Sequence, residues 1–95
     1  MAVPDYQSIM LPLLKEVSDK EVHSMHVVVE ALASTFKLTD EDRRELLPSG
    51  GQAVFTNRVG WARTYLKKAG LLESPKRSMV RITPRGLEVL KEAPE

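Results

Sequence analysis

Positively charged side chains are concentrated in the second half of the chain. Residues 51–95 hold nine Lys and Arg against four Asp and Glu, whereas residues 1–50 hold five against nine. Within residues 56–85 there are eight basic side chains and a single acid, Glu73, although the net charge of the whole chain is only +1. A segment of this charge is typical of a surface that binds a polyanion such as nucleic acid. The alternative is an ordinary solvated surface.

Other patterns that could support chemistry are incomplete. His23 and His26 lie three residues apart, but no third or fourth metal ligand accompanies them, and the chain has no cysteine. Gly50-Gly51 is not followed by Lys, so it is not a phosphate-binding loop, and there is no Gly-x-Ser-x-Gly turn. The sequence therefore predicts neither a metal site nor a cofactor.

Length and composition favour a small folded domain. The chain has 95 residues, of which 42% are hydrophobic and 28% charged, and these values are typical of one globular domain spanning residues 1–95. No apolar run approaches the ~18–20 residues needed to cross a bilayer. Residues 1–5 have neither the basic nor the apolar part of a signal peptide. We therefore expect a cytoplasmic protein with no membrane partner.

The first part of the chain predicts two helices and a short strand. A helix is expected over about residues 4–18, and Pro12 should kink it or divide it in two. A short edge strand is expected within residues 22–25. A second helix should follow, from a cap at Ser24 to Phe36.

The next two helices have clear boundary signals. The capping-box pattern of residues 39–42 predicts a third helix that ends near Leu47, and the Pro and Gly residues within 48–51 then break the chain. A fourth helix is expected over about residues 56–69, with a polar cap at its first or second residue. Gly70 suits the position just after its end.

A β-hairpin and a last helix complete the order of elements. Residues 71–73 and 79–83 read as two strands joined by a loop at 74–78, and Thr83 can cap a helix that begins with Pro84. Helix, strand, two helices and a hairpin with a basic loop is the order of a winged helix-turn-helix. The predicted fold class is therefore mainly α with a small β-hairpin, an α+β winged helix.

The helix over 56–69 is the candidate recognition helix. At 100° per residue, Gly60, Arg63, Thr64 and Lys67 share its outer face, and small, hydroxylic and cationic groups suit a DNA major groove. The alternative for this face is a solvated surface. The opposite face is expected to be buried and consists of Ala62, Tyr65, Leu66 and Ala69, with Trp61 on its flank.

The hairpin loop adds a second basic element, which in winged helices lies along the DNA backbone or in the minor groove. Arg58 has two interpretations, a structural ion pair with an acid of the first half or a phosphate contact at the start of the helix. The predicted contacts to duplex DNA are Asn57, Arg58, Arg63, Thr64, Lys67, Lys68, Lys76, Arg77 and Arg81.

Three segments closely resemble the amino-terminal domain of Mrr-type restriction endonucleases, namely Asn57-Arg58-Val59-Gly60-Trp61-Ala62, Leu66-Lys67-Lys68-Ala69-Gly70-Leu71-Leu72 and Arg81-Ile82-Thr83-Pro84-Arg85-Gly86. Shorter agreements occur at Val3-Pro4 with Pro12, at Leu38-Thr39-Asp40-Glu41 and at Leu47-Pro48-Ser49-Gly50. The resemblance thus covers nearly the whole chain. It implies a winged-helix domain that places a separate nuclease domain on duplex DNA, typically DNA with modified bases.

Two features depart from that family. Its wing often has Gly near the position of Ser78, so a different hairpin geometry is expected here. The nucleases themselves need an Asp/Glu-x-Lys pair and an upstream Asp to hold Mg²⁺ and activate water, and none of the thirteen Asp and Glu residues here has Lys two positions later. We therefore expect this chain not to be an enzyme by itself. If it is part of a longer protein, a covalently attached nuclease domain is expected.

Two other functions fit the same pattern. A transcription regulator would bind a palindromic operator as a homodimer, with the first or last helix at the dimer interface. A protein-interaction adaptor would instead use Arg63, Lys67 and Arg77 to bind an acidic partner. A footprint of two half-sites would identify the regulator, and negligible affinity for random duplex would identify the adaptor.

We predict that the purified chain does not cleave duplex DNA, whether methylated or unmethylated and with or without Mg²⁺, because it lacks the residues that bind the ion. Conversion of supercoiled plasmid to the nicked form measures this. Nicking that is reproduced by independently purified preparations would reveal an active site that these motifs do not describe.

Overall fold

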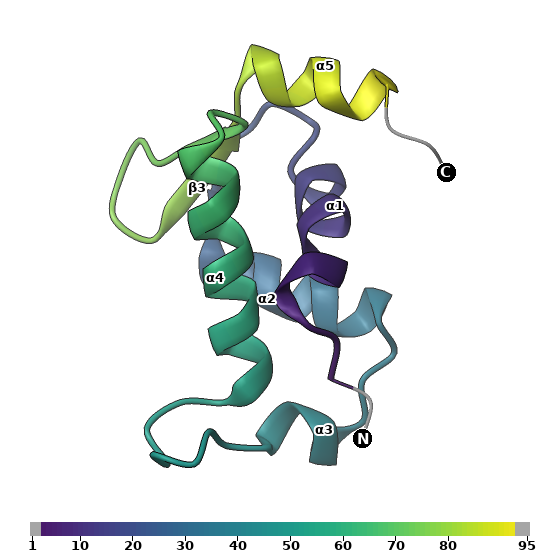
Figure 1. Cartoon of the computed structure of the whole chain (residues 1–95), viewed down its shortest axis with the longest axis vertical. Coiled ribbons are helices and arrows are strands. Elements are labelled where there is room, and N and C mark those ends of the chain that lie inside the picture. The colour runs from purple at the N-terminus through teal and green to yellow at the C-terminus, as the bar shows by residue number, and fades with distance from the viewer. Residues whose placement is uncertain (1–2, 93–95) are drawn as a thin grey trace.

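The computed structural model describes residues 3–92, which are mostly helical with a small antiparallel sheet (Figure 1). In chain order the elements are α1 (Tyr6–Glu16), β1 (His23–Ser24), α2 (Met25–Thr35), α3 (Asp40–Arg44), α4 (Val54–Lys68), β2 (Leu72–Glu73), β3 (Met79–Ile82) and α5 (Pro84–Glu92). The predicted class is confirmed, since this is an α+β winged-helix-like fold. No helix within residues 3–92 is long and apolar enough to cross a membrane.

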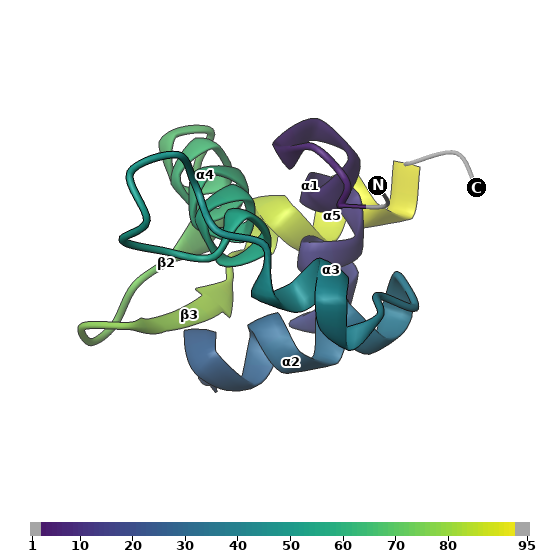
Figure 2. The ribbon, with the colours of Figure 1, turned by 90° about the horizontal axis from the view of Figure 1, so that it is seen from below.

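The sheet has the strand order β1-β3-β2, and both pairs are antiparallel. On one side of β3, Val80 pairs with His23, which confirms the short edge strand. On the other side, Ile82 pairs with Leu72 to form the predicted hairpin. We call this hairpin, residues 72–82, the wing, and its loop projects away from the helices (Figure 2).

The hydrophobic core lies between α1, α2, α4 and the inner side of the sheet. Apolar residues recur at helical spacing, so each helix turns one stripe inward, and α1 packs most extensively against α4. The buried residues are Val3, Ile9, Leu13, Leu14, Val17, Val28, Leu32, Ala33, Val54, Phe55, Val59, Ala62, Leu66, Leu72, Val80 and Ile82. None of the buried residues within 3–92 is polar or charged. Apolar packing therefore determines how the helices are placed.

Helix α1 is shorter than predicted and continues through Pro12. Asp5 is its N-cap, and the Asp5 carboxylate accepts a hydrogen bond of 2.8 Å from the backbone N–H of Ser8. The predicted division at Pro12 is wrong. Proline has no backbone N–H, so one helical hydrogen bond is missing at Pro12. The helix continues past it because Ile9 and Leu13, on either side, are buried in the core.

Helix α2 is joined to the wing at its first residue. Ser24 occupies the N-cap position, but its side chain makes no capping hydrogen bond. The backbone N–H of Met25 donates instead to the carbonyl of Ser78, at 2.9 Å. Val27 is apolar but 58% exposed, because the buried stripe of this helix begins at Val28.

The capping box of α3 is confirmed. The hydroxyl of Thr39 accepts a hydrogen bond from the backbone N–H of Asp42 at 3.0 Å, and the Asp42 carboxylate accepts one from the Thr39 N–H at 3.2 Å. The helix ends at Arg44, earlier than predicted, because the chain then extends to form a β-bridge between Leu46 and Ala53.

Helix α4 begins at Val54, ahead of the polar residues 56 and 57 that were predicted as caps. Ala53 occupies the N-cap position without a side-chain hydrogen bond. Val54 and Phe55 are both buried, so packing against the core, rather than a polar cap, determines where this helix starts.

Helix α4 ends at a corner that also starts α5. Gly70 has a φ of +79°, and the backbone N–H of Leu71 donates to the Leu66 carbonyl at 2.9 Å, as in a Schellman motif. The Thr83 hydroxyl donates to the Gly70 carbonyl at 2.6 Å and accepts from the Gly86 N–H at 3.0 Å. Thr83 therefore caps α5 as predicted and also connects it to the end of α4.

We predict that Gly86→Ala destabilises the fold, because a Cβ at this position would lie 2.4 Å from the Leu71 carbonyl oxygen and 2.7 Å from Cγ1 of Ile82. Overpacking of this kind costs about 1–3 kcal/mol, which corresponds to a fall in Tm of at least ~4 °C for a domain of this size. Gly51→Ala is the control, since its Cβ would meet only Oγ of Ser49, at 3.9 Å. Equal melting temperatures for the two variants would contradict the close packing at Gly86.

Candidate nucleic-acid interface

The predicted contact residues lie on α4 and on the wing loop. On α4, Arg63 and Thr64 are half-buried, while Lys67 and Lys68 are exposed. On the loop, Lys76 and Arg77 are exposed. The hydrogen bond from α2 to Ser78 draws the base of this loop toward the start of α2. The start of α2, the outer face of α4 and the base of the wing therefore border one surface.

Two open grooves run along this surface. The first, of about 330 Å³, lies between α2 and α4 and reaches the wing, and its lining includes Met25, Val29, Glu30, Thr56, Gly60, Arg63 and Ser78. We call it the α2–α4 groove. The second, of about 240 Å³, follows α4 and is lined by Gln52, Asn57, Gly60, Trp61, Arg63 and Thr64. Because Gly60 and Arg63 line both, the two grooves meet on the outer face of α4.

Arg58 is engaged inside the fold. Its guanidinium donates to the carbonyls of Val3 and Pro4, at 3.1 and 3.3 Å, in a partly buried position. The ion-pair interpretation is therefore right about a structural role but wrong about the partner, which is backbone rather than an acid side chain. The hydrogen bond from the Ser8 backbone lowers the pKa of Asp5, and the positive charge of Arg58 lowers this pKa further.

Three further predicted residues make polar contacts with other residues of the fold. The Arg81 guanidinium binds the Glu73 carboxylate across the wing, with Nε and Nη2 at 2.6 and 2.5 Å. The Thr64 hydroxyl donates to the Gly60 carbonyl at 3.0 Å and keeps its oxygen available as an acceptor. The Asn57 amide donates to the Gln52 side chain at 3.2 Å. Arg81 thus pairs across the wing, whereas Thr64 and Asn57 remain at the edge of a groove.

The wing loop is ordered by its serines. Oγ of Ser74 lies 2.8 Å from the Met79 carbonyl and 3.0 Å from the Lys76 carbonyl. Ser78 has a φ of +62°, in the left-handed region that glycine adopts most easily. This serine therefore takes the backbone conformation for which a glycine is suited, and the expected difference in hairpin geometry from the family stays a prediction.

The aromatic residues of α4 are exposed, contrary to the sequence interpretation. Trp61 is 51% and Tyr65 41% exposed. The ring of Tyr65 stacks on Tyr6, with centroids 4.9 Å apart, and lies 6.1 Å from Trp61. Ala62 and Leu66 are buried as predicted, together with Val59. The Tyr65 ring faces Tyr6 of α1, whereas Trp61 lines the groove along α4.

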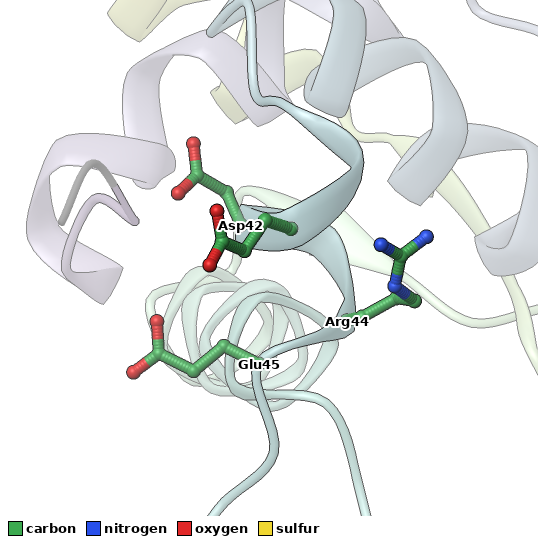
Figure 3. Close-up of a pocket in the computed structure, with 4 residues that line it drawn as sticks. Asp42, Arg44 and Glu45 are labelled. Carbon is green, nitrogen blue, oxygen red and sulfur yellow. The ribbon is translucent and has the colours of Figure 1, made fainter.

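Acidic side chains gather elsewhere, around α3. Asp42 and Glu45 project on one side of this helix and Arg44 on the other, beside an open hollow that they line with Glu41 (Figure 3). Among residues 3–92, no three His, Cys, Asp or Glu side chains are arranged to hold a metal ion. His23 contacts the Asp19 carboxylate at 2.7 Å. Figure 1 places α3 beyond the first turn of α4 and the wing beside its later turns, so acidic and basic regions are separated along α4.

The sequence interpretation missed the contribution of α2. Met25, Val29 and Glu30 form one wall of the α2–α4 groove, yet their spacing indicated only an amphipathic helix. The one signal in the sequence was Gly60, which lines the same groove. Glycine is unfavourable inside a helix, so its presence there indicates a position where space above the backbone is needed.

An α+β winged-helix-like fold with a basic helix and wing defines the general class of this protein. Residues 6–92 match the model of the Mrr N-terminal domain, and the chain belongs to this family. It is 36% identical over 96 residues to the "Type IV methyl-directed restriction enzyme EcoKMrr" of Escherichia coli (strain K12), in an alignment that covers 100% of this chain and 31% of that protein. The chain thus spans about a third of this relative. No solved structure matches it.

We predict that Arg58→Ala lowers the stability of the fold, because it removes the charged hydrogen bonds to two backbone carbonyls. Such bonds contribute about 1.5–3 kcal/mol each at most, and less where water can replace them. Urea unfolding followed by circular dichroism measures the change. Lys67→Ala on the exposed face of α4 is the control and should stay within about ±0.5 kcal/mol. An Arg58→Ala variant as stable as this control would return Arg58 to the set of DNA contacts.

Proposed function

We propose that this chain binds duplex DNA and directs a restriction enzyme to it, with α4 in the major groove and the wing along the backbone. The observation that carries the proposal is the meeting of two basic elements at one surface, since Arg63 lines the same groove as Ser78 at the base of the wing loop. Family membership and the relative's printed name support a role in restriction. The proposed location is the cytoplasm.

Among the predicted contacts we distinguish three roles. Arg63, Thr64 and Lys67 face the bases or the phosphates that flank them. Lys68, Lys76 and Arg77 contact phosphates, which provides affinity without reading sequence. The remaining residues act indirectly, since Arg58 and Arg81 are engaged with groups of the fold and Asn57 orients Gln52.

The relative is described as methyl-directed. We propose that this chain contributes to the same selectivity and favours duplexes with methylated bases, while a separate domain of the full protein performs cleavage. A homodimer through α1 or α5 stays a prediction from the sequence.

We predict weak binding of the chain to random duplex, with a Kd of about 10⁻⁴–10⁻⁶ M at physiological salt and a slope of log K against log salt near −0.9 per phosphate contacted. Lys67→Ala and Arg77→Ala should each make this slope shallower by about one unit if they remove a phosphate contact. Fluorescence anisotropy at several salt concentrations measures both values.

Lys37→Ala provides the control, because Lys37 is exposed just beyond the end of α2 that lies away from the groove. It should bind as the parent chain does. Absence of binding, or binding that salt does not change, would contradict the proposed function.

A further inference from the structure

Gly60 lies inside α4 at a position where the fold does not require a glycine. Glycine in a helix interior lowers stability relative to alanine. A Cβ built on Gly60 meets no heavy atom within 4 Å, whereas one built on Gly86 would collide with the Leu71 carbonyl. The φ of Gly60 also lies outside the left-handed region. Neither packing nor backbone conformation within residues 3–92 therefore requires a glycine here.

The space above Gly60 belongs to the basic surface. Gly60 lines both the α2–α4 groove and the groove along α4, and Arg63 stands beside it in both. Thr56 and Lys67 lie one and two turns away on the same side of the helix, at the spacing of one helical face. A partner that enters here meets the bare backbone of α4 next to cationic side chains. Such a site suits the edge of a base pair flanked by phosphates.

On its α2 side the α2–α4 groove is lined by His26 and Glu30 and by two apolar side chains, Met25 and Val29, which we call its apolar wall. Met25 and Val29 are half-buried and pack against the core, and each presents its remaining surface to the groove opposite Thr56. In the major groove, methyl groups of bases are recognised by apolar contacts of this kind, and exocyclic amino groups are recognised by acceptors. Glu30, which also lines the groove, has its carboxylate paired with the Arg43 guanidinium.

We propose that Gly60 is the point where the α4 backbone approaches a base edge, and that Met25 and Val29 receive a methyl group projecting from that edge into the major groove. This inference rests on the proposed function. It adds to that function the site that distinguishes methylated from unmethylated duplex. The shared chemistry is a major-groove methyl group, which 5-methylcytosine and N6-methyladenine both carry.

Gly60→Ala tests the first part of the inference, because it separates stability from binding. The variant should melt ~4–8 °C higher than the parent through helix propensity. Its affinity for duplex should fall about 10–100-fold, because the added methyl group overpacks the contact with the base edge. The matched control is Ser34→Ala on the exposed face of α2, which also improves helix propensity but lies away from both grooves. It should keep the affinity of the parent.

Val29→Thr tests the second part, because it keeps the shape of the side chain and places a hydroxyl in the apolar wall. The probes are duplexes of one randomised sequence pool that carry 5-methylcytosine, N6-methyladenine or no modification. The affinity of the parent for one methylated probe should exceed its affinity for the unmodified probe by about fourfold or more, the value of one buried methyl group. Val29→Thr should bring this ratio toward one. Val27→Thr, the same substitution at an exposed position of α2, should leave the ratio unchanged.

The outcomes separate the inference from the proposed function. If the parent chain shows no salt-dependent binding, the proposed function fails. If the parent binds but Gly60→Ala binds equally well, or melts lower than the parent, the approach at Gly60 is wrong and the proposed function stands. If Val29→Thr keeps the full methyl preference, or the parent prefers neither methylated probe, the apolar wall does not read the methyl group. The probe that the parent prefers identifies the modified base.

Discussion

The packing of α4 against α1 determines the rotation of α4 about its own axis. Val59, Ala62 and Leu66 form the buried stripe of α4, and Ile9, Leu13 and Leu14 are the fully buried residues of α1. Once this stripe is buried, every other side chain of α4 has a set direction. The basic face is turned outward and the large aromatic rings are turned to a flank. A shift by one position would bury a cation and expose the core.

Two polar links fix the neighbouring elements around that helix. The Thr83 hydroxyl connects the end of α4 to the start of α5. Because the wing lies between these two helices in the chain, this link brings the two ends of the wing together. The Met25 N–H, bonded to the Ser78 carbonyl, connects the base of the wing loop to α2. Both links use groups that helix ends leave without intrahelical partners. These hydrogen bonds therefore link the elements that border the surface between α2, α4 and the wing.

Basic residues serve the fold as well as the surface. Arg58 binds carbonyls of the segment before α1, and Arg81 pairs with Glu73 across the wing. Their neighbours Arg63 and Arg77 have no acid partner among the ion pairs within residues 3–92. A count of charges along the chain does not distinguish the two pairs. Replacing Arg58 or Arg81 should mainly lower stability, whereas replacing Arg63 or Arg77 should mainly weaken binding.

The sequence by itself determined the features that depend on near neighbours. The capping box at Thr39, the left-handed Gly70 and the Thr83 cap each involve residues a few positions apart, so their local chemistry is sufficient to predict them. Tertiary structure decided what depends on distant partners. It kept α1 whole through Pro12, because burial of its neighbours outweighs one lost hydrogen bond. It also exposed Trp61, because an apolar side chain is buried only where another element covers its face of the helix.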